Sequence, residues 1–259
     1  MTLRRTISHE PAFVLHQYPW SESSLILEVY TRHHGRLAIA AKGVKRPTSS
    51  FRPVLLPLQP LSLNIGGDGE IRTLKAAEWL GGHVMPSGDA LLSGFYLNEL
   101  LLRLLPRDDP HPALFDAYRQ AVLMLAQGGD SAVVPALRAF ELILLREMGV
   151  LPGLRVQTLS LQPVLETAHY DLVPEGGLRD SGAQDHWEDR RHRLSGSHWC
   201  AVQDALEGDH AFADLVRLLA HWNTEDRTTL QHQLRALVHH HGGMEVLRTR
   251  QLMMDLQAL

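Results

Sequence analysis

A cluster of positive charges is the part of this sequence best suited to hold a ligand. Residues 42–52 contain two lysines, two arginines and no acid, and residues 31–41 add two arginines and again no acid. Such clusters bind phosphate backbones through counterion release, and neighbouring glycine and serine let the main chain approach closely. Phe51 could stack on a base. The alternative is a solvated loop at the rim of a domain.

The charge of the chain is unevenly distributed. The net charge of −4 would, taken alone, argue against a nucleic-acid partner. Residues 1–80, however, hold ten Lys and Arg against six Asp and Glu, while the remaining residues hold 15 against 23. All three lysines of the chain lie in the first part. This asymmetry suggests one basic functional face on an otherwise acidic body.

The basic segment lies within a region that predicts five short strands. Gly66–Gly69 is expected to form a hairpin loop, and the run before it alternates apolar and polar residues as a half-buried strand does. Five strands in about 75 residues is the size of an OB-fold barrel, a fold that binds single strands or oligosaccharides. The strands are expected at Ala12–His16, Ser24–Thr31, Arg36–Ala41, Leu61–Ile65 and Glu70–Glu78.

After Gly81 and Gly82 the apolar period changes from two to 3.6, which predicts helices. We therefore expect an α+β protein, with a five-stranded OB-fold over 1–80 and a mainly α-helical domain over 81–259. A helix near 91–105 is apolar on nearly every side and is expected to be the buried centre of a bundle, ended by Pro106.

Two more helices are expected near 114–125 and 133–148. Ser131 is the expected N-cap of the second and Gly149 its stop. Residues 153–196 are punctuated by glycine and predict a small irregular insertion, with short strands near Leu159–Leu161 and Tyr170–Leu172. Helices then return, and Gly242–Gly243 is expected to separate the last two.

No pattern in the sequence predicts an active site. Walker, Rossmann and nucleophile-elbow motifs are absent. The consecutive residues His239–His241 would point about 100° apart on a helix and would not converge on one metal ion. The single cysteine, Cys200, excludes an intramolecular disulfide and a cysteine-rich zinc site. Without a signal peptide or an apolar run of about 18 residues, the protein is expected to be cytoplasmic.

Segments spread over nearly the whole chain resemble the bacterial RecO family of DNA repair and recombination mediators. The order and spacing of these segments are more specific than any one of them. They are residues 12–16, 19–25, 35–36, 41–43, 58–60 and 73–78, followed by 96–100, 115–118, 137–142, Gly242–Gly243 and 247–250.

The resemblance implies an OB-fold joined to a helical domain, without enzymatic turnover and without a cofactor. It implies a protein, monomeric when free, that binds single- and double-stranded DNA and anneals complementary strands. With RecR, such a protein helps to load RecA onto DNA coated by single-strand binding protein (SSB). In this interpretation the phosphates are contacted by Arg36, Lys42, Lys45, Arg46, Arg52 and Lys75.

Two further expectations follow from the resemblance. Arg138, with Leu142 and Phe115, is implied to hold the acidic C-terminal tail of SSB, although an arginine beside an apolar helical face often only reaches to water. Many family members carry a four-cysteine zinc module in the region of 153–196. No cysteine remains there in this chain, so no structural metal is expected.

Two other functions remain open from the sequence. The barrel could belong to an interaction adaptor whose basic loop serves an acidic protein partner, and competition between oligonucleotide and peptide would separate this from DNA binding. A hydrolase that uses the histidine cluster or the Asp108–His111 linker has the least support.

Overall fold

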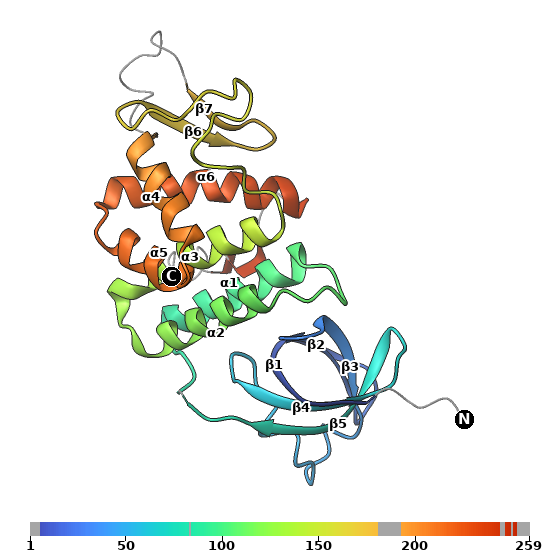
Figure 1. The fold of residues 1–259 in the computed structure, drawn as a ribbon. Helices are drawn as coiled ribbons and strands as arrows, with labels where there is room; N and C mark the ends of the chain where they lie inside the picture. Colours follow the sequence, from blue (N-terminus) through green and yellow to red (C-terminus); the bar gives the residue numbers. More distant parts are fainter. Residues whose placement is uncertain (1–5, 83, 181–192, 244–246, 250, 253–259) are drawn as a thin grey trace. The chain divides into compact units, whose positions relative to one another are not determined.

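A computed structural model of the protein describes residues 6–82, 84–180, 193–243, 247–249 and 251–252. The chain forms two compact units (Figure 1). The first consists of residues 1–127 and 248–259, and the second of residues 128–247. Two helices beyond residue 80 therefore belong to the compact unit that contains the barrel, and a domain boundary at residue 80 stays a prediction of the sequence.

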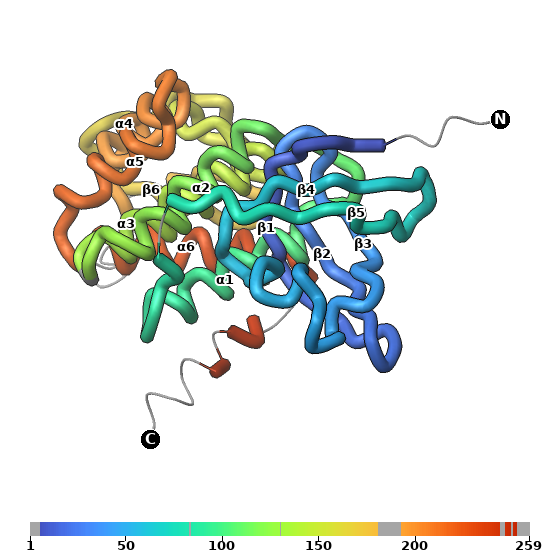
Figure 2. The backbone as a smooth tube through the Cα atoms, turned by 90° about the horizontal axis from the view of Figure 1, so that it is seen from below, coloured from blue at the N-terminus to red at the C-terminus, as the bar shows by residue number. Residues whose placement is uncertain are grey.

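The first unit contains a closed barrel with the strand order β1-β2-β3-β5-β4. Neighbouring strands are antiparallel except for β3 and β5, which are parallel, and β1 closes the barrel against β4 (Figure 2). The predicted five-stranded barrel is thus confirmed. Its strands are β1 (Thr6–Pro19), β2 (Leu25–Thr31), β3 (Gly35–Ala41), β4 (Leu61–Gly66) and β5 (Ile71–Trp79).

Strand β1 is longer at both ends than the sequence predicts. Its pairing register shifts between Ile7 and Glu10 and again between Val14 and His16. Such bulges bend a strand and interrupt the two-residue alternation, so the pattern shows only the middle of β1. The bends let one strand pair with β2 along one part and with β4 along another.

Alternate side chains of the five strands point inward and fill the barrel. This spacing follows from the period of two along a strand, which places every second residue on the core face. The core includes Val14, Leu27, Val29, Leu37, Ile39, Leu61, Leu63, Ile65 and Leu74.

Helices α1 (Gly88–Leu104) and α2 (Pro112–Gln127) belong to the same unit as the barrel. The side chain of Asn98 on α1 donates to the main-chain oxygen of Leu15 at 3.1 Å, next to the second bulge of β1. Tyr118 on α2 donates to the same asparagine at 2.6 Å. Gly94 leaves room for the buried side chain of Leu58 against α1, because a Cβ there would lie 2.4 Å from Leu58 Cδ1.

The second unit is built around α3 (Asp130–Glu147), which contacts α5 and α6. Every residue from Arg138 to Leu145 is buried, so α3, and not the helix at 91–105, is the helix surrounded on most sides. Its N-cap is Gly129 instead of the predicted Ser131. The other helices are α4 (Gly196–Glu207), α5 (Ala211–Ala220) and α6 (Thr224–Gly242).

The insertion contains more regular structure than the sequence predicts. Strands β6 (His169–Val173), β7 (Gly177–Asp180) and β8 (Leu194–Ser195) form an antiparallel sheet in the order β7-β6-β8. Tyr170 and Leu172 lie in β6 as expected, whereas Leu159 and Leu161 are exposed and outside any strand. Residues 181–192 of the insertion lie outside the described part, as does most of the expected helix after Gly243.

Candidate nucleic-acid interface

The basic loop begins at the end of β3 and is fixed to the loop between β1 and β2. Gly43 adopts a φ of 71°, which a residue with a Cβ rarely adopts. The main-chain nitrogen of Lys45 donates to Ser23 O at 3.0 Å, and that of Gly43 donates to Ser24 Oγ at 3.3 Å. The loop is therefore held at its base, and its charged side chains are carried on a defined backbone.

Lys42, Lys45, Arg46 and Arg52 are all exposed. Lys45 donates through Nζ to Ser21 O at 2.8 Å, which keeps its ammonium group beside the β1–β2 loop and leaves two donors for a ligand. Among the described residues, none of the four has an acidic partner within salt-bridge distance. Their charges are thus uncompensated, as phosphate binding requires.

Two of these cations share one hollow. Lys45 and Arg52 line a cavity of about 230 Å³, together with Gln17 of β1 and the apolar side chains of Leu25 and Leu55. The amide of Gln17 donates to Leu55 O at 2.6 Å, which fixes the return of the loop toward the barrel. Residues seven positions apart in the sequence therefore face the same small surface.

Lys75 reaches the outer surface from β5. The register between β4 and β5 shifts at Asn64 and Ile65, and Lys75 is the extra residue of this bulge. Its stem lies over Gly66, where a Cβ would come within 2.7 Å of Lys75 Cε. The side chain is exposed, as the DNA-binding prediction requires.

Arg36 differs from the other five predicted cations because its guanidinium group is engaged in hydrogen bonds and an ion pair within the protein. Its Nη1 donates to Glu28 Oε2 at 3.0 Å, and its Nε donates to Leu105 O at 3.0 Å. The second oxygen of Glu28 accepts from Arg107, in the linker between α1 and α2. The Glu28 hydrogen bond and charge raise the pKa of Arg107 against the opposing effect of burial. Arg36 therefore serves an ion-paired cluster and has little charge left for phosphate.

Two other arginines of the barrel are neutralised in the same way. Arg72 donates to Asp108 at 2.6 Å, and Arg32 pairs with Asp116 at 2.8 Å. The hydrogen bond from Arg32 lowers the pKa of Asp116 below its ordinary value despite desolvation. The arginines near the start of β3 are therefore paired with carboxylates, whereas the cations of the loop that follows β3 are not paired with acids in the described chain.

The aromatic side chains near the loop have other roles than expected. Phe51 packs against the barrel core and is half-buried, so the structure does not present it as a stacking surface. Tyr18 and Trp20 are instead 46% and 54% exposed on the neighbouring β1 and its following loop. The sequence signal for them was an aromatic pair spaced by two at a strand end.

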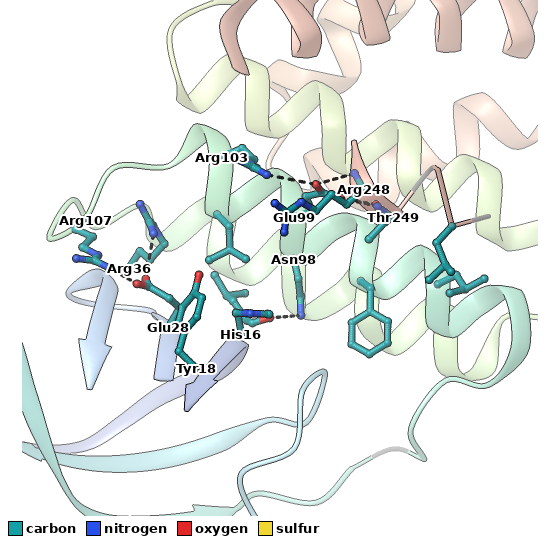
Figure 3. Close-up of a pocket in the computed structure, with 15 residues that line it drawn as sticks. His16, Tyr18, Glu28, Arg36, Asn98, Glu99, Arg103, Arg107, Arg248 and Thr249 are labelled. Carbon is teal, nitrogen blue, oxygen red and sulfur yellow. Dashed lines mark hydrogen bonds and ion pairs between the residues drawn. The ribbon is translucent and has the colours of Figure 1, made fainter. Parts of the chain in front are cut away.

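A larger pocket of about 660 Å³ lies between β1, α1 and the residues Arg248, Thr249 and Leu252 of the first unit (Figure 3). Glu99 on α1 forms one side of it and accepts from the main-chain nitrogens of Arg248 and Thr249, both at 2.9 Å. Arg103, four residues along α1, lies 4.0 Å from the same carboxylate. Burial raises the pKa of Glu99, and hydrogen bonds from Thr249 and Arg248 lower it. Together the hydrogen bonds have the greater effect, so the pKa lies below its ordinary value.

The residues implied to hold the SSB tail are buried. Arg138 is 6% exposed and pairs with Glu141 at 2.7 Å, and its Nε has no hydrogen-bond partner among the described residues. Leu142, one turn along α3, is fully buried. Phe115, on α2 of the other unit, packs against Phe13 and Tyr30 with ring centroids 5.6 and 5.3 Å away. These three residues stay predictions as a peptide site.

The described residues contain no group of three or more His, Cys, Asp or Glu able to hold a metal ion. Within the same residues, no helix has the length and apolar character needed to cross a membrane.

Comparison with known proteins gives consistent matches over both units. Family models described as Recombination protein O N terminal and Recombination protein O C terminal match residues 5–83 and 85–251. The chain is 59% identical to the DNA repair protein RecO of Variovorax paradoxus, with all of both chains covered. It is 59% identical to that of Polaromonas naphthalenivorans over 98% of each chain, and 56% identical to that of Delftia acidovorans over all of both.

Proposed function

Because the chain belongs to the RecO family of DNA repair proteins, we propose that it is a DNA-binding recombination mediator whose barrel holds phosphates through its basic loop. The observation that carries this proposal is the set of cations at 42–52. They are exposed, they have no acidic partner in the described chain, and they stand on a barrel of the kind that binds single strands. Lys75 adds a fifth cation from β5.

Binding of this kind acts on both single- and double-stranded DNA, because phosphate contacts carry no base information. Annealing follows if the protein screens the repulsion between two complementary strands. In cooperation with RecR, the protein would help RecA to replace SSB on single-stranded DNA in the bacterial cytoplasm. It acts in this scheme by binding, without catalytic turnover.

The interaction with SSB is proposed to involve Arg138. Its guanidinium is buried beside Leu142 and already pairs with Glu141. An acidic peptide would therefore compete with an internal carboxylate for the same arginine. This competition predicts that binding of the tail needs a local rearrangement of α3, and that it weakens as salt increases.

The experiment that tests the proposal is an anisotropy titration of a labelled single-stranded oligonucleotide at several salt concentrations. The test variant replaces Lys42, Lys45 and Arg46 by alanine. The control variant removes the same number of charges from exposed positions of the second unit, Arg155, Arg179 and Arg217. Loss of three phosphate contacts should lower the slope of log affinity against log salt by about 2 for single strands.

The control should bind as the unchanged protein does, with the same salt slope. Equal affinity and equal slope for the loop variant would refute the assignment of the loop. Absence of DNA binding even at low salt would refute the proposed function as a whole. In that case the basic loop would serve an acidic protein partner, and competition with acidic peptides would detect it.

A further inference from the structure

Three ring side chains stand at alternate positions along the outer side of β1 and its following loop. His16 and Tyr18 are exposed, and their ring centroids lie 4.5 Å apart with an interplanar angle of 68°. Trp20 is the next alternate residue and is 54% exposed. Successive rings at every second residue form an aromatic stripe, which is defined here as His16, Tyr18 and Trp20.

One end of the aromatic stripe meets the basic loop. The main-chain nitrogens of Trp20 and Ser21 both donate to Ser24 O, at 3.2 and 3.3 Å, which fixes the turn that carries the indole. The ammonium group of Lys45 is bonded to the oxygen of the adjacent Ser21 at 2.8 Å. A base stacked on Trp20 would therefore have its phosphate close to the lysine.

The other end of the stripe opens into the 660 Å³ pocket, where His16 and Tyr18 form one wall (Figure 3). Leu92, Phe95 and Leu102 of α1 supply an apolar wall. A cavity of this volume is in the range that holds small organic ligands, and a nucleotide belongs to that size class.

The pocket has an excess of positive charge. Four arginines and two glutamates line it, and both glutamates already accept hydrogen bonds within the protein. The guanidinium of Arg248 has no ion-pair partner in the described chain, and that of Arg103 is 40% exposed at 4.0 Å from Glu99. These two arginines are thus available for a phosphate.

We propose that the aromatic stripe and the pocket together form a binding track for single-stranded DNA. Bases stack on Trp20 and Tyr18, and one nucleotide enters the pocket with its phosphate on Arg103 and Arg248. The inference rests on the proposed function and deepens it, because it assigns strand selectivity to residues outside the basic loop.

Base stacking and pairing explain why a single strand fits and a duplex does not. In a duplex each base is stacked between its neighbours, so its faces are not free to stack on Tyr18 or Trp20. A base in a duplex is also paired and cannot enter the pocket without being flipped out.

The test compares Tyr18→Ala and Trp20→Ala with a matched control, Trp79→Ala. Trp79 is 55% exposed at the end of β5, so each variant removes an exposed aromatic side chain from the same barrel. Stacking on one aromatic ring corresponds to roughly a tenfold gain in affinity for single strands. Each test variant should therefore bind a single-stranded oligonucleotide about tenfold more weakly, while binding of a duplex and the behaviour of the control stay within about twofold.

A second variant tests the pocket. In Arg248→Ala the main-chain nitrogen still bonds to Glu99, so the segment remains anchored. The slope of log affinity against log salt for single strands should fall by about 0.7. Tryptophan fluorescence gives an independent signal, because quenching by single-stranded DNA should be largely lost in Trp20→Phe. Thermal unfolding of each variant confirms that it is folded.

The inference is overturned if Tyr18→Ala and Trp20→Ala bind single strands as Trp79→Ala does. It is also overturned if they lose duplex binding to the same extent. Neither result bears on the proposed function, which fails as a whole only if the unchanged protein binds no DNA even at low salt.

Discussion

Replacing Glu99 by glutamine should weaken the attachment of Arg248 and Thr249 to helix α1. The carboxylate accepts from the main-chain nitrogens of Arg248 and Thr249 at 2.9 Å each, and from Thr249 Oγ1 at 2.7 Å. Both carboxylate oxygens are used. Glutamine keeps one acceptor oxygen and replaces the other by an amide nitrogen, which cannot accept, so at least one main-chain N–H loses its partner.

The size of the effect follows from the charge of the acceptor. Hydrogen bonds to a charged group contribute about 1.5–3 kcal/mol each, and the variant loses one or more of three and weakens the others. We expect the free energy of opening this segment to fall by about 2–3 kcal/mol, which is about 30- to 160-fold in the opening equilibrium.

The effect should depend on pH. Although burial raises the pKa of Glu99, the hydrogen bonds from Thr249 and Arg248 and the charge of Arg103 lower it below its ordinary value of 4.5. A lowered native pKa means that the stabilisation is present above the ordinary value and is lost as the pH falls through the native one. The difference between Glu99→Gln and the unchanged protein should therefore be full at pH 7 and shrink below pH 4.5.

Hydrogen exchange of the Arg248 and Thr249 amides measures this opening directly. The matched control is Arg103→Ala, because its i,i+4 contact with Glu99 is long, at 4.0 Å, and 40% exposed. Such a pair contributes about 0.5 kcal/mol or less. Equal protection of the two amides in Glu99→Gln and the unchanged protein at pH 7 would refute the reasoning, as would an equal effect of the control.

Three other substitutions have expected outcomes. Glu28→Ala leaves two arginines beside a buried site without their carboxylate, so urea unfolding should show a loss of about 3–5 kcal/mol; a loss under 1 kcal/mol would contradict the cluster's role. Gly35→Ala adds a Cβ 2.2 Å from the main-chain oxygen of Asp109, at a φ of 68° that favours glycine. Its free energy of unfolding in urea should therefore fall by at least about 2 kcal/mol, and an unchanged value would contradict the strain at this position. Arg138→Gln should weaken binding of an acidic tail peptide in anisotropy while leaving affinity for single-stranded DNA unchanged; parallel losses of both would argue against a separate peptide site.

Most of the fold could be predicted because its patterns are local. The alternation of Leu61, Leu63 and Ile65 marks β4, and Gly149 and Gly243 end helices with φ values of 70° and 63°. The extent of β1 could not be predicted, since its bulges shift the apolar positions by one residue. The N-cap of α3 was wrong because Gly129, with φ 65°, turns the chain one residue before the helix.

The candidate site could be predicted only in part, because the sequence shows how many charged residues a segment contains but not which of them form ion pairs in the fold. The exposed cations of the loop were visible as a run without acids. Arg36 belonged to the same run, yet it pairs with Glu28 on the neighbouring strand, and Arg107 reaches that glutamate from 79 positions away. Tyr18 and Trp20 gave a weaker signal, since exposed aromatic residues at a strand end also occur for their β propensity.

The pairing of charges also predicts how steeply DNA binding should depend on salt. Arg32, Arg36 and Arg72 of the barrel are matched by carboxylates, whereas Lys42, Lys45, Arg46, Arg52 and Lys75 are exposed without an acidic partner among the described residues. Within the barrel, only the second set is free to release counterions from phosphates. These five contacts, with Arg103 and Arg248 of the proposed track, give a slope near 5 for single strands at about 0.7 each, against about 7 if Arg32, Arg36 and Arg72 also took part. A measured slope near the larger value would mean that the ion pairs around the start of β3 open when DNA binds.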